Sequence, residues 1–309
     1  MHIHHHWTGL PLDARGTSLA MGNFDGLHRG HRSVIDAARA ALDAPLGVLT
    51  FEPHPRQYFA PDAPPFRLMN AEARANRLRR LGVEHLFELP FGPVLAGLSP
   101  ESFAHEVLLT GLGCAHVTVG RDFCFGKGRR GNAETLRELG GRLGFGVTIA
   151  DLLGEDGRDF SSTAIRAALS EGRPREAEHM LGHWHRIEGE VLHGEKRGRR
   201  LGYPTANMSM DGLHLPKLGV YAVIADVLSG PHKGSWPGVA SLGVRPMFGV
   251  NTPNLEVHLF DFEGDLYGEH LSVALIDYLR PEARFDSLDA LIVQMDRDSA
   301  QARAILAAR

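Results

Sequence analysis

Glycines and histidines gather in the segment 21–31, which reads Met-Gly-Asn-Phe-Asp-Gly-Leu-His-Arg-Gly-His. A short, mainly apolar run at 17–21 leads into it, and the apolar residues of the following segment, 32–42, recur with helical spacing. This order predicts a strand, a glycine-rich turn and a helix. Glycine and histidine at the start of a helix point to phosphate chemistry.

The glycines and the histidines of this segment would have separate tasks. Gly22, Gly26 and Gly30 would let backbone N–H groups approach a phosphate, at a helix start that carries a partial positive charge. His28 and His31 would donate hydrogen bonds to the oxygens of a transferring phosphate and so stabilise its charge. A turn with surface histidines is the alternative for an isolated His-x-Gly-His. The complete pattern, between a strand and a helix, favours nucleotide binding.

The complete pattern resembles the signature of the nucleotidylyltransferase superfamily, and its Gly-Asn-Phe-Asp-Gly form is similar to the FMN adenylyltransferase branch. That branch normally carries a riboflavin kinase domain on its carboxyl side. The resemblance therefore implies that the rest of this chain contains such a domain. The resemblance implies catalytic roles for His28 and His31. It also implies that nucleotide and phosphate contact the residues Gly22, Asn23, Phe24, Asp25 and Gly26.

The composition is that of a globular protein long enough for two domains. The chain has 309 residues, of which 43% are hydrophobic and 23% charged, with a net charge of -4. This balance gives no broad electrostatic reason to expect nucleic acid or an anionic membrane as a partner. Two cysteines are too few for a disulfide framework, so we expect a cytoplasmic protein, and we expect no transmembrane helix. The histidine-rich segment 2–6 could bind a transition metal adventitiously, but we expect it to be a frayed native end or an added tag, without a role in function.

Strand-like and helical segments alternate through the rest of the amino half. Buried strands are expected at 46–51, 84–89 and 115–119, and helices at 70–81 and 99–109. This alternation predicts a Rossmann-like, doubly wound parallel sheet. In such a sheet, ligands bind in the crevice at the carboxyl ends of the strands.

Two loops of the amino half would lie at that crevice. One is Glu52-Pro53-His54-Pro55, and the other is the segment 120–132. A loop histidine without function is the alternative for His54. Both loops resemble segments of the FMN adenylyltransferase family, which implies that His54, Asp122 and Phe123 lie at the flavin site.

Hydroxyl side chains and an arginine open a predicted helix after Phe160. The hydroxyls suit the helix cap, and a cap alone would explain the serines. Arg166, on the first turns, would stabilise a departing pyrophosphate bound at the helix start. The segment resembles the second signature of the superfamily, Ser-Ser-Thr-x-x-Arg. The resemblance implies phosphate contacts from Ser161, Ser162 and Thr163 and a catalytic role for Arg166.

The sequence pattern changes at Gly182-His183-Trp184-His185. Strand-like segments then recur between glycine and proline turns, at 187–191, 220–227, 236–242, 255–260 and 271–278. They predict a small antiparallel β-barrel, with a helix at 287–308 that packs on it. The chain is thus expected to be α/β plus β, with a boundary after residue 182. The resemblance implies an FMN adenylyltransferase domain at 1–182 and a riboflavin kinase domain at 183–309.

Basic residues, glycines and hard oxygen donors gather in the segment 198–207, Gly-Arg-Arg-Leu-Gly-Tyr-Pro-Thr-Ala-Asn. Gly198 and Arg199 are the expected contacts to the phosphates of ATP, while a threonine hydroxyl and an asparagine carbonyl suit Mg²⁺. A basic hairpin loop is the alternative for the arginines alone. The part Gly-x-Pro-Thr-Ala-Asn resembles the riboflavin kinase signature, which implies that Thr205 and Asn207 hold Mg²⁺ and phosphate.

Glu256 is the candidate base of the carboxyl half. It matches the glutamate of the kinase family at that position, and the neighbouring segment 260–268 also resembles the family. A carboxylate is the simplest acceptor for the proton of a ribityl 5′-hydroxyl. An exposed strand glutamate is the alternative. The family commonly has threonine where Met247 stands, a departure that we expect to weaken ligand affinity at most.

The resemblance spans residues 17–305 and points to the prokaryotic FAD synthetase family. It implies a riboflavin kinase and an FMN adenylyltransferase in one chain, with riboflavin, FMN and ATP as substrates, Mg²⁺ as cofactor and no obligate protein partner. One alternative is an enzyme in which only one half is active. The other is a flavin-binding carrier or sensor without turnover, which would bind flavin but form no ATP-dependent product.

Overall fold

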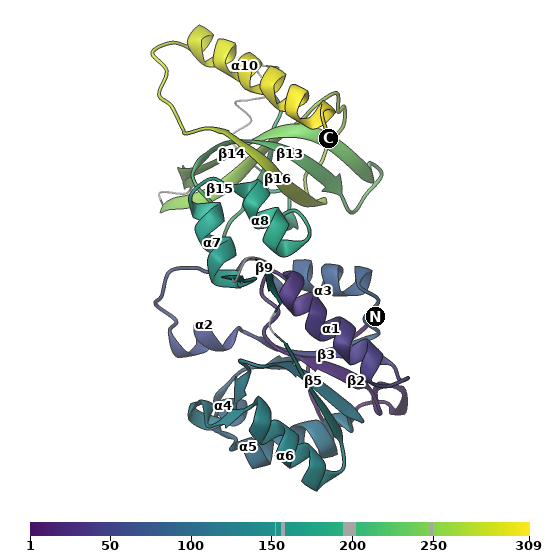
Figure 1. Cartoon of the computed structure of the whole chain (residues 1–309). Helices are drawn as coiled ribbons and strands as arrows, with labels where there is room; N and C mark the ends of the chain where they lie inside the picture. The colour runs from purple at the N-terminus through teal and green to yellow at the C-terminus, as the bar shows by residue number, and fades with distance from the viewer. Residues whose placement is uncertain (152, 156–157, 194–201, 248–249) are drawn as a thin grey trace. The chain divides into compact units, whose positions relative to one another are not determined.

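The computed structural model describes the whole chain except residues 152, 156–157, 194–201 and 248–249. By their contacts, the residues form two compact units (Figure 1). The first unit comprises residues 1–64 and 74–161. The second unit comprises residues 65–73 and 162–309.

A six-stranded parallel sheet forms the centre of the first unit. In spatial order its strands are β1 (His2–His4), β4 (His85–Pro90), β3 (Leu46–Glu52), β2 (Ser18–Met21), β5 (His116–Gly120) and β8 (Gly146–Ala150). Every neighbouring pair runs parallel. The chain moves outward from β2 to β4 and then returns to the other side of β2 with β5. The strand order therefore reverses between β2 and β5, which confirms the doubly wound sheet.

Helices cover both faces of this sheet because alternate residues of a strand point to opposite sides. The helices are α1 (Arg29–Ala41), α2 (Pro55–Phe59), α3 (Ala71–Arg80, beginning in the second unit), α4 (Pro93–Gly97), α5 (Pro100–Ser102), η2 (Phe103–Leu112) and α6 (Ala133–Leu143). Leu19 and Met21 of β2 join the buried cluster with η2 and α6. Ser18 instead donates a hydrogen bond to the Ala38 carbonyl of α1 at 2.5 Å. Figure 1 shows α1 and α6 on opposite faces.

The helix expected at 99–109 has a different form. A single α-helical turn, α5, leads directly into the π-helix η2, which continues to Leu112. Gly111 of this π-helix lies against Trp7, whose carbonyl oxygen would be 2.5 Å from a Cβ at position 111. Gly113 then ends the helix in the left-handed conformation, with a φ of 58°. Close packing of the backbone around Gly111 is a tertiary contact that helical periodicity does not predict.

The amino end is a strand rather than a frayed segment, so the expectation for residues 2–6 is wrong in part. Residues 2–4 form β1, which pairs in parallel with β4. The ring of His4 stacks on His85 and on Phe87, with centroid separations of 5.5 Å and 5.0 Å. His4 Nε2 and His85 Nδ1 are 3.2 Å apart. Backbone pairing and ring stacking together order this end.

An antiparallel sheet forms the centre of the second unit. In spatial order its strands are β11 (Arg186–Glu190), β16 (His270–Arg280), β13 (Gly219–Val227), β14 (Gly234–Met247), β15 (Val250–Leu259) and β12 (Ala206–Ser209). Its helices are α7 (Ser162–Ser170), α8 (Pro174–Leu181) and α10 (Leu288–Ala307). The Leu192 N–H donates to the Asn207 carbonyl at 2.8 Å and nearly closes the sheet between its two edges. The predicted barrel and carboxyl-terminal helix are confirmed.

The strands of the barrel separate a core from an outer face. Leu255 and Val257 of β15 are buried in the core. Glu256 lies between them and therefore points to the outer face. Helix α10 covers part of this outer face, where Ala302 packs against Ala222. Glu256 therefore lies on the face of the barrel that α10 partly covers.

Residues before position 183 also belong to the second unit. Leu68 and Ile165 share a buried cluster with α8. The side-chain amide of Asn70 donates to the Glu188 carbonyl of β11 at 2.9 Å. These contacts anchor α7 and the segment 65–73 to the barrel. The functional boundary after residue 182 stays a prediction.

His185 lies buried just before β11, and its carbonyl accepts a hydrogen bond from the Leu275 N–H at 3.0 Å. Burial lowers the pKa of His185 from 6.5 to about 3, with smaller contributions from His214 and His183. An unfolded chain takes up a proton near the ordinary pKa, whereas the folded chain takes it up only near the lowered value. The free energy of unfolding therefore decreases as the pH falls from 6.5 towards 3.

We expect His185→Gln to weaken this pH dependence, because glutamine takes up no proton. The measurement is the urea midpoint at about pH 7 and about pH 4.5, followed by the fluorescence of the three tryptophans. The midpoint of the wild type should fall more than that of the variant. His179→Gln, at an exposed histidine of α8, is the matched control and should keep the wild-type dependence. Equal decreases in wild type and His185→Gln would contradict the assignment.

Candidate functional site

The first signature forms the predicted strand, turn and helix. β2 ends at Met21 and α1 begins at Arg29, with His28 as its N-cap. His28 Nδ1 accepts a hydrogen bond from the backbone N–H of His31 at 3.2 Å. The two imidazole rings stack with their centroids 3.6 Å apart and their planes 21° from parallel. The helix start thus carries two adjacent histidine rings.

The turn before these histidines has an unusual backbone. Phe24, Gly26 and Leu27 have φ values of 51°, 86° and 46°, in the left-handed region. For a residue with a Cβ this conformation costs on the order of 1 kcal/mol or more. Burial offsets the cost, since Phe24 and Leu27 are 1% and 2% exposed. The Thr50 hydroxyl also donates to the Asn23 carbonyl at 3.2 Å and ties the turn to β3.

His31 is partly buried, and the edge of its ring faces Phe24 at a centroid distance of 5.3 Å. Burial lowers the pKa of His31 well below its ordinary value, and the charge of His28 lowers it further. Nδ1 of His31 has no hydrogen-bond partner among the described residues. In the free protein at neutral pH, His31 is therefore an uncharged donor of one ring N–H. A bound phosphate would favour its protonation.

Gly30 has a steric role that the sequence did not reveal. A Cβ at position 30 would lie 3.1 Å from His28 Nδ1 and 3.4 Å from the Phe160 carbonyl oxygen. A side chain there would therefore push on the capping histidine. At Gly22 a Cβ would meet only the Phe24 ring, at 3.4 Å or more, so the phosphate contact remains the reason expected for that glycine.

His54 lies at the carboxyl end of β3 and caps α2. Its Nδ1 accepts from the Arg56 N–H at 3.0 Å, and its own backbone N–H donates to Gln57 Oε1 at 3.2 Å. Arg74 is fully buried and holds the end of β3, because its Nη2 donates to a Glu52 carboxylate oxygen at 2.9 Å. The structure thus fixes the position of His54, and its contact with flavin stays a prediction.

Asp122 and Phe123 follow the carboxyl end of β5. Asp122 is exposed, and Phe123 is partly buried against the core with its ring stacked 5.9 Å from that of Phe125. β2, β3 and β5 are neighbours in the parallel sheet, so His28, His54 and Phe123 follow strand ends along one edge. The strand order reverses at this edge, which is where doubly wound sheets bind nucleotides.

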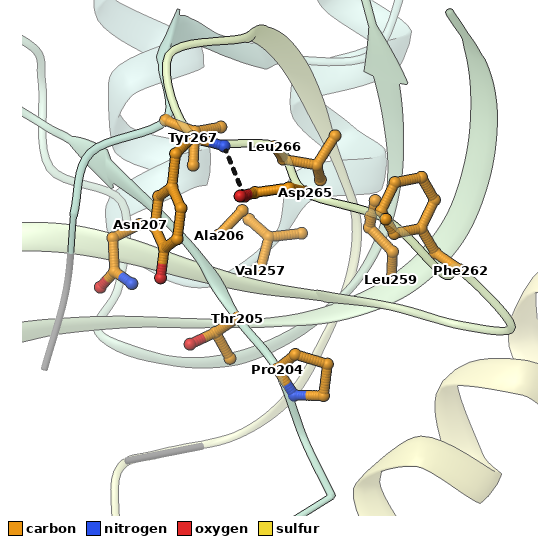
Figure 2. Close-up of a pocket in the computed structure, with 12 residues that line it drawn as sticks. Pro204, Thr205, Ala206, Asn207, Val257, Leu259, Phe262, Asp265, Leu266 and Tyr267 are labelled. Carbon is orange, nitrogen blue, oxygen red and sulfur yellow. Dashed lines mark hydrogen bonds between the residues drawn. The ribbon is translucent and has the colours of Figure 1, made fainter. Parts of the chain in front are cut away.

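Two cavities of the second unit contain three of the residues predicted for the kinase reaction, Thr205, Asn207 and Glu256. Thr205 and Asn207 line the first cavity together with aromatic and apolar side chains, among them Phe262, Leu266 and Tyr267 (Figure 2). Figure 2 shows the side chains of Thr205 and Asn207 below the loop that carries Tyr267, whose backbone N–H donates to Asp265 at 3.2 Å. The oxygen atoms of Thr205 and Asn207, which could bind a metal ion, therefore lie beside an aromatic and apolar surface that could pack against a planar ring.

The second cavity has a volume of ≈ 220 Å³ and a mainly apolar wall. Glu256 lines it, opposite Phe285, Leu291 and Met295 from the segment before α10 and from α10 itself. Thr205 lines both cavities. The two cavities are therefore neighbours, with the predicted metal ligands at one and the predicted base at the other.

A residue that sequence analysis missed links these groups. Asn254 is 5% exposed, and its Nδ2 lies 3.4 Å from Asn207 Oδ1 and 3.4 Å from Glu256 Oε1. In the register of the sheet, Asn207 pairs with Glu256. The signal was present in the sequence, because a polar residue two positions before Glu256 on a strand shares its face.

Comparisons with known proteins identify a family for each half of the chain. The family model of FAD synthetase matches residues 10–164, and that of riboflavin kinase matches residues 181–306. A protein of Pseudomonas fluorescens named bifunctional riboflavin kinase/FMN adenylyltransferase is 42% identical over 302 residues and covers 96% of both chains. The protein of the same name from Escherichia coli strain K12 is 40% identical, covering 93% of this chain and 92% of its own. The chain belongs to this bifunctional family.

A solved structure shows that the likeness extends to the whole fold. The crystal structure described as a macrolide-efflux protein of Streptococcus pneumoniae has a TM-score of 0.81 and 31% identity, and the match covers 96% of this chain and 95% of that chain. Its description differs from the names of the bifunctional family. Within the part of the chain that the structure describes, no helix is long and apolar enough to cross a membrane.

The remaining residues of the expected family site are divided between the two units or lie outside the described residues. Arg166 belongs to the second unit, where its Nε donates to the Phe66 carbonyl at 2.6 Å and its guanidinium lies 5.2 Å from the Phe66 ring centroid. Its approach to His28 and His31 stays a prediction. Ser162 begins α7, while Ser161 is the last residue of the first unit. The predicted phosphate contacts Gly198 and Arg199 lie outside the described residues.

We expect Gly30→Ala to lower FMN adenylylation at least about tenfold, because the added methyl group displaces the His28 ring from its cap position. Riboflavin phosphorylation by the same protein should remain unchanged. Gly141→Ala in α6 is the matched control, since a Cβ there meets no atom within 4 Å. Steady-state FAD formation from FMN and ATP is the measurement. Wild-type adenylylation in Gly30→Ala would refute the steric argument.

Proposed function

We propose that this chain phosphorylates riboflavin to FMN and then adenylylates FMN to FAD, with ATP as the donor in both steps. The observation that carries the proposal is the meeting of two cavities at Thr205, with Asn207 at the first and Glu256 at the second. ATP in the first cavity and riboflavin in the larger, apolar second cavity would bring the γ-phosphate and the ribityl 5′-hydroxyl together. Family membership supports both activities.

In the kinase reaction, Glu256 would accept the proton of the ribityl 5′-hydroxyl. The hydroxyl oxygen would form a bond to the γ-phosphorus as the bond from that phosphorus to the β-bridging oxygen breaks, and ADP would leave with the electron pair. Glu256 points to the outer face of β15 and lines the apolar cavity, which is where this hydroxyl would lie. Gly198 and Arg199 remain proposed phosphate contacts.

A Mg²⁺ ion fits the donors present in the first cavity. Thr205 offers a hydroxyl and Asn207 an amide carbonyl, which are hard oxygen ligands, and phosphate oxygens and water would complete the shell. When bound, the ion would offset the charge of the β- and γ-phosphates. Thr205 and Asn207 are thus the proposed protein ligands.

In the adenylyltransferase reaction, an oxygen of the FMN phosphate would attack the α-phosphorus of ATP. The bond from that phosphorus to the β-phosphate would break, and pyrophosphate would leave with the electron pair. His28 and His31 would donate to the phosphate oxygens at the start of α1, and Arg166 would bind the departing pyrophosphate. The FMN phosphate is itself the nucleophile, so no covalent enzyme intermediate is required.

The remaining contacts of this reaction follow from the edge of the parallel sheet. Backbone and side chains of the turn would hold the nucleotide, and His54, Asp122 and Phe123 would hold the flavin. The proposed nucleotide contacts are Gly22, Asn23, Phe24, Asp25, Gly26, Ser161, Ser162 and Thr163. We assign this reaction to a domain at 1–182 and the kinase reaction to a domain at 183–309, which the ranges of the two family models support.

Product analysis tests the proposal directly. The purified protein is incubated with riboflavin, ATP and Mg²⁺, and a parallel reaction starts from FMN. We expect FMN followed by FAD in the first reaction and FAD in the second. FMN alone would show an inactive adenylyltransferase half. Flavin binding without any ATP-dependent product would overturn the enzymatic proposal in favour of a carrier.

Glu256→Gln should lower riboflavin phosphorylation by a factor of about 10² or more, because glutamine cannot accept the proton. FAD formation from FMN should continue at the wild-type rate, and an unchanged thermal midpoint serves as the control for folding of the barrel. Retained kinase turnover would refute the assignment of the base.

His31→Ala should lower adenylylation and spare phosphorylation, the opposite of Glu256→Gln. Loss of one charge-stabilising donor typically costs about 10²-fold or more in turnover, so FAD formation from FMN should fall by that amount while FMN formation from riboflavin continues. Rates of both half-reactions are measured on one preparation. A change in adenylylation of only a few fold would show that His31 does not stabilise the transferring phosphate.

A further inference from the structure

Asn254 is a buried amide on the outer face of β15, between the two groups to which the kinase reaction is assigned. It is 5% exposed. Its Nδ2 is 3.4 Å from Asn207 Oδ1, on the neighbouring strand β12, and 3.4 Å from Glu256 Oε1, two residues along its own strand. Both distances are at the long end of the hydrogen-bond range, as is common for active-site contacts before substrate binds.

The chemistry of the amide fixes its orientation. A primary amide nitrogen carries two hydrogens, and here two oxygen acceptors face it. One hydrogen is donated to Asn207 Oδ1 and the other to Glu256 Oε1. The Asn207 amide is held with its oxygen towards Asn254, and one lone pair of that oxygen stays available to a cation. The contact holds one carboxylate oxygen of Glu256, Oε1, beside the amide.

The stability of the fold does not account for this arrangement. Asn254 Oδ1 is buried and has no hydrogen-bond partner in the described part of the chain. Burying an amide oxygen without a partner is destabilising. An apolar side chain of similar shape would remove that cost, and the replacement of a partly satisfied buried amide by such a group is often neutral or stabilising. A functional role explains why asparagine occupies the position.

We propose that Asn254 is a positioning residue for riboflavin phosphorylation, which holds the metal ligand Asn207 and the base Glu256 in one fixed relation. It touches neither substrate and acts through these two side chains. The inference rests on the proposed kinase function. It adds that one amide group couples the orientation of the metal ligand to the orientation of the base.

Asn254→Leu tests the role by removing the donor at nearly constant volume. We expect kcat for riboflavin phosphorylation to fall about 10–100-fold with a nearly unchanged KM for riboflavin, because the apolar cavity is intact. The thermal midpoint should stay equal or rise. A residue that only stabilised the barrel would show the opposite pattern, with a lowered midpoint and an unchanged kcat.

Asn254→Asp supplies an independent readout. It keeps the shape but replaces the donor with a carboxylate that repels Glu256 Oε1 and Asn207 Oδ1. Calorimetric titration with ADP, with and without Mg²⁺, measures binding apart from turnover. We expect both Asn254→Leu and Asn254→Asp to change the Mg²⁺-dependent part of ADP affinity, since each releases Asn207. Wild-type ADP affinity at both Mg²⁺ conditions, in both variants, would overturn the coupling to Asn207.

Two controls separate the possible failures. FAD formation from FMN by each variant reports whether the first unit is folded, and the thermal midpoint reports on the barrel. Ser272→Ala removes a buried hydroxyl of β16 that donates to Glu188 at 2.8 Å, and it should lower the thermal midpoint without changing kinase kcat. If the wild type forms no FMN, the proposed function itself fails. If the wild type is active and Asn254→Leu matches its kcat, only the role of Asn254 is refuted.

Discussion

The alternation of side chains along a strand is the constraint on which the candidate site of the second unit depends. On β15, Leu255 and Val257 enter the core of the barrel, so Asn254 and Glu256 must share the outer face. A shift of one residue in the pairing of β12 with β15 would exchange these faces and separate Asn207 from Glu256. The packing of the apolar residues therefore sets the register of the polar ones.

In the first unit, the common direction of the strands positions the residues of the candidate site. All six strands run parallel, so their carboxyl ends lie along one edge, and the loops that follow β2, β3 and β5 gather there. Fully buried Arg74 ties down the end of β3, and the hydroxyl of Thr50 ties the turn after β2 to the same strand. The loops that would meet ligand after β2 and β3 are thus held from within the sheet.

Periodicity and two signatures were enough to predict the doubly wound sheet, the barrel and the final helix, because these features follow from local patterns of apolar residues. The strand at 2–4 was missed, since its order comes from pairing with β4 and from the ring of His85. The π-helix was missed, and so was the close approach of Trp7 to Gly111, which joins distant parts of the sequence. A local pattern of apolar residues does not predict contacts between residues that are far apart in the sequence.

The candidate site was predictable to the extent that it follows a signature. Thr205, Asn207 and Glu256 were named from sequence, and the structure places them around two neighbouring cavities. Asn254 was not named, because its importance lies in two distances across strands. The steric reason for Gly30 also needed coordinates, since it depends on the position of the His28 ring.

The capping role of His28 has a consequence for the proton on its ring. Nδ1 accepts the backbone N–H of His31, so the neutral imidazole carries its hydrogen on Nε2. The backbone of the first helical turn therefore selects one tautomer of this side chain. His54 is constrained in the same way by the Arg56 N–H. Both rings consequently keep an Nε2–H donor when they are uncharged, so their hydrogen bonding to an anion does not depend on acid conditions.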